Sequence, residues 1–130
     1  MSGNKIKGFV RFQRRERIAD TALVETILAA ERGLVDADLG GGLIKLRIAR
    51  PGQGKSGGFR TLIAYRRGER AVFLFGFAKN ERDNVDDDEL ETLRERGKLF
   101  LALNTGQLAQ LLAEGDLTEV EYDEKSKAKS

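Results

Sequence analysis

Three segments with the character of β-strands lie close together in the middle of this chain and constrain its fold more than any other feature. Residues 43–49 alternate in polarity, and residues 59–66 and 70–78 are rich in aromatic and β-branched side chains. The tripeptide Arg67-Gly68-Glu69 separates the last two segments as a hairpin turn does, and residues 51–58 are a glycine-rich loop. The sequence therefore predicts three neighbouring antiparallel strands.

The alternation also predicts which side chains share a face of these strands, because successive side chains of a strand point to opposite sides. One face of the first strand is expected to carry Leu43, Lys45 and Arg47, and the other Ile44, Leu46 and Ile48. The third strand is expected to carry Phe73, Phe75 and Phe77 on one face. Lys45 and Arg47 should therefore project from the sheet together.

Helical patterns precede the predicted strands. Residues 9–18 indicate a short helix with a basic face. A second helix is expected to start at Asp20 or Thr21, whose side chains can accept from its free N–H groups, and to stop at Gly33. These two segments together predict an N-terminal helical hairpin.

Two further helices are expected after the strands. The acidic run Asp86-Asp87-Asp88-Glu89 suits the positive end of a helix dipole and opens the first of them. Its apolar side is expected to consist of Leu90, Leu93, Leu99 and Leu103. A short helix follows at about residues 105–113. The chain is thus predicted to be an α+β domain, with the helical hairpin packed on a small antiparallel sheet of three or more strands, C-terminal helices, and one sheet face left open.

The composition excludes several classes of protein. With 130 residues the chain fits one domain, expected over residues 1–121, and a charged, disordered tail over residues 122–130. No stretch approaches the roughly 18 apolar residues of a membrane span, and no secretory signal is evident, so a cytoplasmic location is expected. The absence of cysteine and histidine removes thiolate nucleophiles, the usual general base and the usual zinc ligands.

Charge is distributed unevenly along the chain. Residues 1–82 hold 17 Lys and Arg against 8 Asp and Glu, whereas residues 83–130 hold 6 against 13. Between Lys45 and Arg82 there are 10 basic and 2 acidic residues. A block with this balance produces a positive field suited to phosphate groups, although a solubilising surface has the same composition.

The segment Gly54-Lys55-Ser56 matches the last three residues of a phosphate-binding loop motif. That motif also needs a glycine at position 49, which is Ala49, and a helix after the serine, where a strand is expected. We therefore interpret the glycines as allowing a mobile loop to bend, with Lys55 at its tip. The acidic run at residues 86–88 could bind a hard cation, but the start of a helix explains it without a metal.

Two longer motifs resemble the RelE/HigB superfamily of type II toxins. The first runs from Arg47 to Arg60 as R-I-A-R-P-G-Q-G-K-S-G-G-F-R, and the second from Gly76 to Asn84 as G-F-A-K-N-E-R-D-N. The match is best to the subgroup that joins a G-K-S-G-G-x-R loop to a later K-N-E-R-x-N, and residues 36–42 fit that subgroup too. The resemblance covers roughly residues 8–121.

This resemblance implies a small microbial-ribonuclease-like sheet of the RelE type and cleavage of mRNA in the ribosomal decoding site. It implies no metal and no cofactor. The implied partners are mRNA, the ribosome and a helix-turn-helix antitoxin that silences the toxin. Operator DNA would be bound only through the complex with the antitoxin.

The site residues follow from the resemblance and from the chemistry of RNA cleavage. Attack by the 2′-hydroxyl needs a base, a group that stabilises the phosphorane, and an acid for the leaving oxygen. A lysine serves as base only if its pKa falls, which crowded like charges cause. We expect Lys55 or Lys79 as base and Arg60 and Arg82 as stabilisers of the transition state. The residues expected to bind RNA are Lys45, Arg47, Arg50 and Tyr65, the last by stacking on a base, a role also considered for Phe77.

Two alternatives stay open. One is a toxin of the same fold that acts on DNA gyrase, as in the ParE branch. The other is a non-enzymatic module that binds nucleic acid, which needs only the basic sheet.

Overall fold

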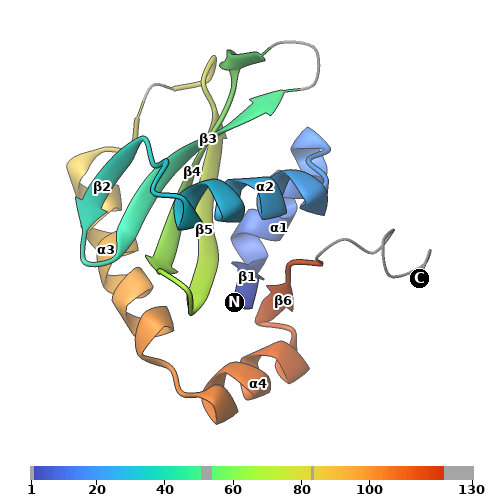
Figure 1. Ribbon diagram of the computed structural model, residues 1–130, viewed down its shortest axis with the longest axis vertical. Helices are drawn as coiled ribbons and strands as arrows, with labels where there is room; N and C mark the ends of the chain where they lie inside the picture. Colours follow the sequence, from blue (N-terminus) through green and yellow to red (C-terminus); the bar gives the residue numbers. More distant parts are fainter. Residues whose placement is uncertain (1, 51–53, 83, 122–130) are drawn as a thin grey trace.

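A computed structural model describes residues 2–50, 54–82 and 84–121, with a six-stranded sheet at the centre (Figure 1). The elements in chain order are β1 (Ser2–Ile6), α1 (Lys7–Glu16), α2 (Asp20–Glu31), β2 (Ala37–Gly40), β3 (Leu43–Arg50), β4 (Gly54–Arg66), β5 (Arg70–Ala78), α3 (Asp87–Ala102), α4 (Thr105–Glu114) and β6 (Leu117–Glu119). The strand order is β2-β3-β4-β5-β1-β6, and only β1 and β5 are parallel among the paired strands. The expected tail, residues 122–130, lies outside the described residues.

The three antiparallel strands predicted from the sequence are confirmed as β3, β4 and β5. The β4–β5 hairpin pairs Arg66 with Arg70 around the expected turn, where Gly68 has a φ of 73°. β4 is longer than expected, because it already begins at Gly54 within the glycine-rich segment. Gly58 in this strand has no room for a side chain, since a Cβ there would lie 2.0 Å from the carbonyl oxygen of Ile48. The close approach of β3 and β4 therefore requires glycine at this position.

The helical hairpin expected at the N-terminus is not confirmed, because the chain starts with the strand β1. This strand pairs with β5 on one side and β6 on the other (Figure 1). Its polar residues gave no strand signal, yet Asn4 and Lys5 are buried. The two predicted helices exist, but α1 packs mainly on β5 and α2 on β3.

The expected cap of α2 is also wrong. The N-cap is Ala19, which has no side chain to accept a hydrogen bond. The carboxylate of Asp20 instead accepts from Lys5 Nζ at 2.9 Å, from Gln13 Nε2 at 2.6 Å and from the N–H of Glu121 at 2.8 Å. Asp20 therefore joins β1, α1 and the C-terminal end of the described chain. The predicted stop of α2 at Gly33 is confirmed by its φ of 80°.

The aromatic side chains of β5 do not share one face as predicted. Leu62 pairs with Phe75 and Ile63 with Phe73, so Leu74 is an extra residue in a β-bulge. The ring centroid of Phe73 lies 5.0 Å from that of Phe9 in α1. Phe75 and Phe77 lie on the opposite face of the sheet, with 6.0 Å between their ring centroids. The bulge interrupts the alternation of side chains, so the residues of β5 after Leu74 point to the opposite face from the one that the alternation predicts.

Helices cover both faces of the sheet rather than one. On the first face, Phe12 of α1 meets Phe59 of β4 edge to face at 5.7 Å. On the second face, α3 runs past β4 closely enough that a Cβ on Gly97 would lie 3.3 Å from that of Ala64. The apolar side of α3 was expected to include Leu99, but this side chain is 69% exposed, and the buried side of the helix is Leu93, Gly97 and Leu101.

The two C-terminal helices follow in the predicted order, and a strand that was not predicted, β6, comes after them. Asp86 and Glu89 form a capping box at the start of α3, and Asn104 and Gln107 form another at the start of α4. β6 then returns to β1, where the N–H of Val120 donates to the carbonyl oxygen of Gly3 at 2.8 Å. Among the described residues, no helix combines the length and the hydropathy that a membrane span requires.

Candidate active site

A row of arginine and phenylalanine side chains crosses β3, β4 and β5 on the face that also carries α3. Arg47 pairs with Arg60, and Arg60 pairs with Phe77, so these three side chains are neighbours across three strands. The guanidinium carbon of Arg82 lies 5.6 Å from the ring centroid of Phe77 and 5.8 Å from that of Phe75. We call these five residues the arginine face.

The pairing geometry brings Arg47 and Arg60 especially close. The carbonyl oxygen of Lys45 accepts from the N–H of Asp36 at 2.9 Å, so Lys45 directs its backbone groups away from β4. The same holds two residues later for Arg47, which makes Arg47 and Arg60 a non-hydrogen-bonded pair of an antiparallel ladder. In such a pair the side chains are at their closest, and like charges directly opposite each other are destabilising.

The two arginines differ in how their charge is compensated. Arg47 Nε donates to Asp36 Oδ2 at 3.2 Å, and both side chains are partly exposed. Arg60 is half-buried, and its Nη1 atom is buried without a hydrogen-bond partner among the described residues. A buried donor of a charged group that lacks a partner is costly, by more than about 1–3 kcal/mol. An anion on this face would remove both that cost and the repulsion from Arg47.

The guanidinium group of Arg82 is oriented by three hydrogen bonds. Its Nη1 donates to Glu89 Oε2 at 3.2 Å, its Nη2 to Glu89 Oε1, and its Nε to the carbonyl oxygen of Asn84 at 3.0 Å. The hydrogen bonds with Glu89 raise the pKa of Arg82 and lower the pKa of Glu89. Arg82 is therefore a permanent, oriented cation at the edge of the arginine face.

The comparison with known protein families points to the same class of protein as the two sequence motifs. Residues 3–120 match the family described as the RelE toxin of the RelE/RelB toxin-antitoxin system.

This chain belongs to the RelE toxin family.

The matched range covers almost the whole described chain, from β1 to the residue after β6. The predicted membership of this family is thus confirmed, and the chain is a toxin of a toxin-antitoxin system, whose partner is an antitoxin. No curated protein matches this RelE toxin.

The other basic residues expected in the site of this RelE toxin lie along the same strands. Lys45 is half-buried on β3, two residues before Arg47. Lys79 directly follows β5, is exposed, and donates its N–H to the carbonyl oxygen of Gly58 at 3.2 Å. Arg50 ends β3 and Lys55 is the second residue of β4, but their side chains lie outside the described part of the chain.

Tyr65, expected to bind RNA, lies apart from the arginine face of this RelE toxin. It is on the opposite face of β4, where its hydroxyl donates to Glu31 at the end of α2. Desolvation and this hydrogen bond raise the pKa of Tyr65 to about 12. Phe77 is only 3% exposed, so it supports Arg82 in this structure and does not offer a free ring face.

Sequence reasoning missed three residues that shape the arginine face. Asp36 neutralises Arg47, Glu89 holds Arg82, and Phe75 lies beneath Arg82. The spacing of Asp86 and Glu89 was a usable signal, because an acidic residue three positions after an N-cap forms a capping box. The contact between Glu89 and Arg82 had no such signal.

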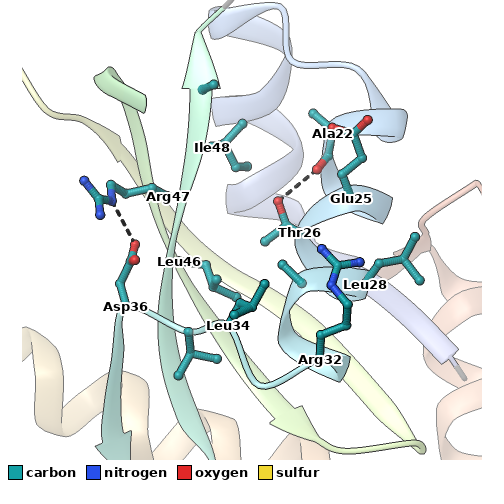
Figure 2. A pocket seen from close by; sticks show the side chains of 13 residues that line it. Ala22, Glu25, Thr26, Leu28, Arg32, Leu34, Asp36, Leu46, Arg47 and Ile48 are labelled. Atoms are coloured by element: carbon teal, nitrogen blue, oxygen red, sulfur yellow. Dashed lines mark hydrogen bonds and ion pairs between the residues drawn. The ribbon is translucent and has the colours of Figure 1, made fainter. Parts of the chain in front are cut away.

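A groove of about 630 Å³ lies between α2 and β3, on the other side of β3 from the arginine face. Figure 2 shows Leu46 and Ile48 pointing from β3 toward α2, whereas Arg47 and Asp36 point away from it and toward each other. Leu28 and Leu34, which also line the groove, are 48% and 59% exposed. Asp36 and Arg47 are themselves among the residues that line the groove, so the groove borders on the arginine face at this ion pair.

Proposed function

We propose that this RelE family toxin is an endoribonuclease that cleaves mRNA through attack of a 2′-hydroxyl on the neighbouring phosphodiester, without a metal. The observation that carries the proposal is the pairing of Arg47 with Arg60, whose buried Nη1 has no described partner. Arg82 lies over Phe77, the cross-strand neighbour of Arg60 on the other side. This arrangement concentrates positive charge where a phosphate with developing negative charge would be stabilised.

The arginines are suited to the transition state because their guanidinium groups stay charged and donate two parallel hydrogen bonds to phosphate oxygens. Arg60 and Arg82 would stabilise the phosphorane. The phosphates on either side of the cleaved bond would be bound by three basic residues of β3, Lys45, Arg47 and Arg50. The products would be a 2′,3′-cyclic phosphate and a 5′-hydroxyl end.

The base that removes the proton of the 2′-hydroxyl is proposed to be Lys55 or Lys79. The chain has no histidine, and these two lysines occupy the positions in the two motifs where the family resemblance expects basic residues. Lys79 is exposed directly after β5, two residues from Phe77 of the arginine face. Replacing Lys79 by alanine should leave the fold intact and slow cleavage.

The resemblance to the RelE/HigB superfamily supports a proposal for the biological setting. The toxin would cut mRNA on the ribosome in the cytoplasm and would be silenced by a helix-turn-helix antitoxin. Operator DNA would be contacted only by the toxin-antitoxin complex.

The test is induction of the toxin in growing cells, followed by mapping of transcript 5′ ends and measurement of plasmid supercoiling. New 5′-hydroxyl ends within coding regions, absent with Arg60→Ala, support the proposal. A change in supercoiling without new ends would identify a gyrase-directed toxin instead. RNA binding without new ends, even with ribosomes, would identify a binding module.

A further inference from the structure

The carboxylate of Glu89 performs two tasks at once. It accepts from Nη1 and Nη2 of Arg82, and its Oε1 also accepts from the N–H of Asp86 at 3.0 Å. Asp86 Oδ1 in turn accepts from the N–H of Glu89 at 2.8 Å, which completes the capping box of α3. The start of α3 and the guanidinium of Arg82 are therefore fixed by the same carboxylate.

These contacts leave Arg82 only part of its hydrogen-bonding capacity. A guanidinium has five N–H donors, and in this structure one on each of Nε, Nη1 and Nη2 is used. Within residues 2–50, 54–82 and 84–121, one N–H on each Nη of Arg82 has no partner and remains for a ligand. The rings of Phe75 and Phe77, 5.8 and 5.6 Å from the guanidinium carbon, fix its position further.

We propose that Glu89 is a positioning residue for RNA cleavage, which holds Arg82 in the orientation that presents its two remaining N–H donors to the phosphate. This inference rests on the proposed function of the arginine face. Glu89 itself does not contact RNA. It acts through Arg82, and α3 supplies the rigid point from which it acts.

The role of Glu89 predicts a particular kinetic effect. Without the carboxylate, Arg82 keeps its charge but loses its fixed orientation, so the stabilisation of the transition state falls. The attraction between Arg82 and the phosphate in the ground state does not fall, because a neighbouring negative charge has been removed. The loss should therefore appear in kcat and not as a higher KM.

Three variants separate the role of Glu89 in orienting Arg82 from its role in capping α3. Glu89→Gln keeps the acceptor that the capping box needs, because glutamine serves at this position, but removes the charge that holds Arg82. Asp88→Asn removes a charge from the same first turn, at an exposed position, and controls for the helix dipole. Asn104→Ala breaks the capping box of α4 and controls for a loss of stability away from the arginine face.

The measurements are kcat and KM for mRNA cleavage on ribosomes, together with the NMR signal of the Arg82 side-chain Nε–H group in the free protein. We expect Glu89→Gln to lower kcat by a factor between about ten and a hundred. KM should change less than about threefold, and the Arg82 signal should broaden or exchange faster with solvent. Asp88→Asn and Asn104→Ala should resemble the wild type in both measurements.

A kcat of Glu89→Gln equal to that of Asp88→Asn would overturn the inference, and so would an Arg82 signal unchanged from the wild type. If the wild-type protein does not cleave RNA, the proposed function fails. The NMR comparison then still decides whether Glu89 orients Arg82.

Discussion

Arg60 on β4 lies directly opposite Arg47 on β3, in the type of cross-strand pair that brings side chains closest together. Asp36 compensates Arg47 at 3.2 Å, whereas Nη1 of Arg60 is buried without a described partner. Two arginines in this relationship weaken a sheet. This is the arrangement expected of a functional site, where residues that favour binding of an anion reduce the stability of the fold.

Replacing Arg60 by leucine should therefore stabilise the fold while it abolishes function. The substitution removes both the like-charge contact and the unpaired buried donor, and we expect a gain of about 1–3 kcal/mol in the free energy of unfolding. Urea denaturation at neutral pH measures this quantity. The matched variant Arg47→Leu should gain less or lose stability, because it leaves Asp36 without its partner. A clear loss of stability in Arg60→Leu would contradict this description of the pair.

Sulfate, as a stand-in for a phosphate group, should bind the arginine face. An anion that binds only the folded state raises its stability with concentration. We expect the melting temperature of the wild type to rise more in sulfate than in chloride of equal ionic strength, and this excess to shrink in Arg60→Leu. Because sulfate stabilises most proteins in general, the difference between the two proteins is the quantity that matters. An equal excess in both would place anion binding elsewhere.

Because of the ion pair between Lys5 and Asp20, the free energy of unfolding should fall when the pH becomes acidic. Burial raises the pKa of Asp20, but hydrogen bonds from the Glu121 N–H, Gln13 and Lys5 outweigh it, so the pKa lies below its ordinary value of 3.8. A carboxylate with a lowered pKa contributes stability above its unfolded-state pKa and loses that contribution as the pH falls through its folded-state pKa.

Asp20→Asn should accordingly cost about 3 kcal/mol at neutral pH, because it leaves the buried ammonium of Lys5 without its counter-charge. The difference between the wild type and the variant should be constant from about pH 5 to pH 8 and should shrink below about pH 4. Urea denaturation across this range is the measurement. A difference that stays the same down to pH 2.5 would show that Asp20 does not act through its charge.

Gly76 should be intolerant of alanine for a steric reason. A Cβ at this position would lie 2.3 Å from Cε2 of Phe12, within the contact between α1 and β5. Because the ring is held by Phe9 and Phe59, we expect Gly76→Ala to cost about 1–3 kcal/mol in the free energy of unfolding. Gly106→Ala is the control, since its Cβ would lie 3.5 Å from its nearest neighbour and alanine favours helix α4. Equal stability of the two variants would mean that the Phe12 ring moves aside at no cost.

The sequence predicted those parts of the fold that depend on local pattern. The hairpin of β4 and β5 was recognisable because its strands are apolar and its turn contains Gly68. β1 was not recognisable, because Asn4 and Lys5 look like surface residues. Lys5 is buried because Gln13 of α1 and Asp20 of α2 supply its hydrogen-bond partners.

The site was predicted in part for similar reasons. Alternation and the family motifs located Arg47 and Arg60, and the structure places them side by side. The arrangement around Arg82 depends on the bulge at Leu74, which three consecutive apolar residues conceal in the sequence. Alternation along β4 is enough to place Tyr65 and Arg60, five residues apart, on opposite faces. The hydrogen bond of Tyr65 with Glu31, 34 residues away along the chain, had no local signal.

The most direct test of the arginine face is cleavage of mRNA on purified ribosomes in the presence of EDTA, with the wild type and Arg60→Leu compared at equal concentration. We expect the wild type to release fragments with 5′-hydroxyl and 2′,3′-cyclic phosphate ends, and Arg60→Leu to be slower by a factor of about 100 or more. Equal rates for the two proteins, or cleavage by the wild type that EDTA abolishes, would contradict the proposed role of the arginine face.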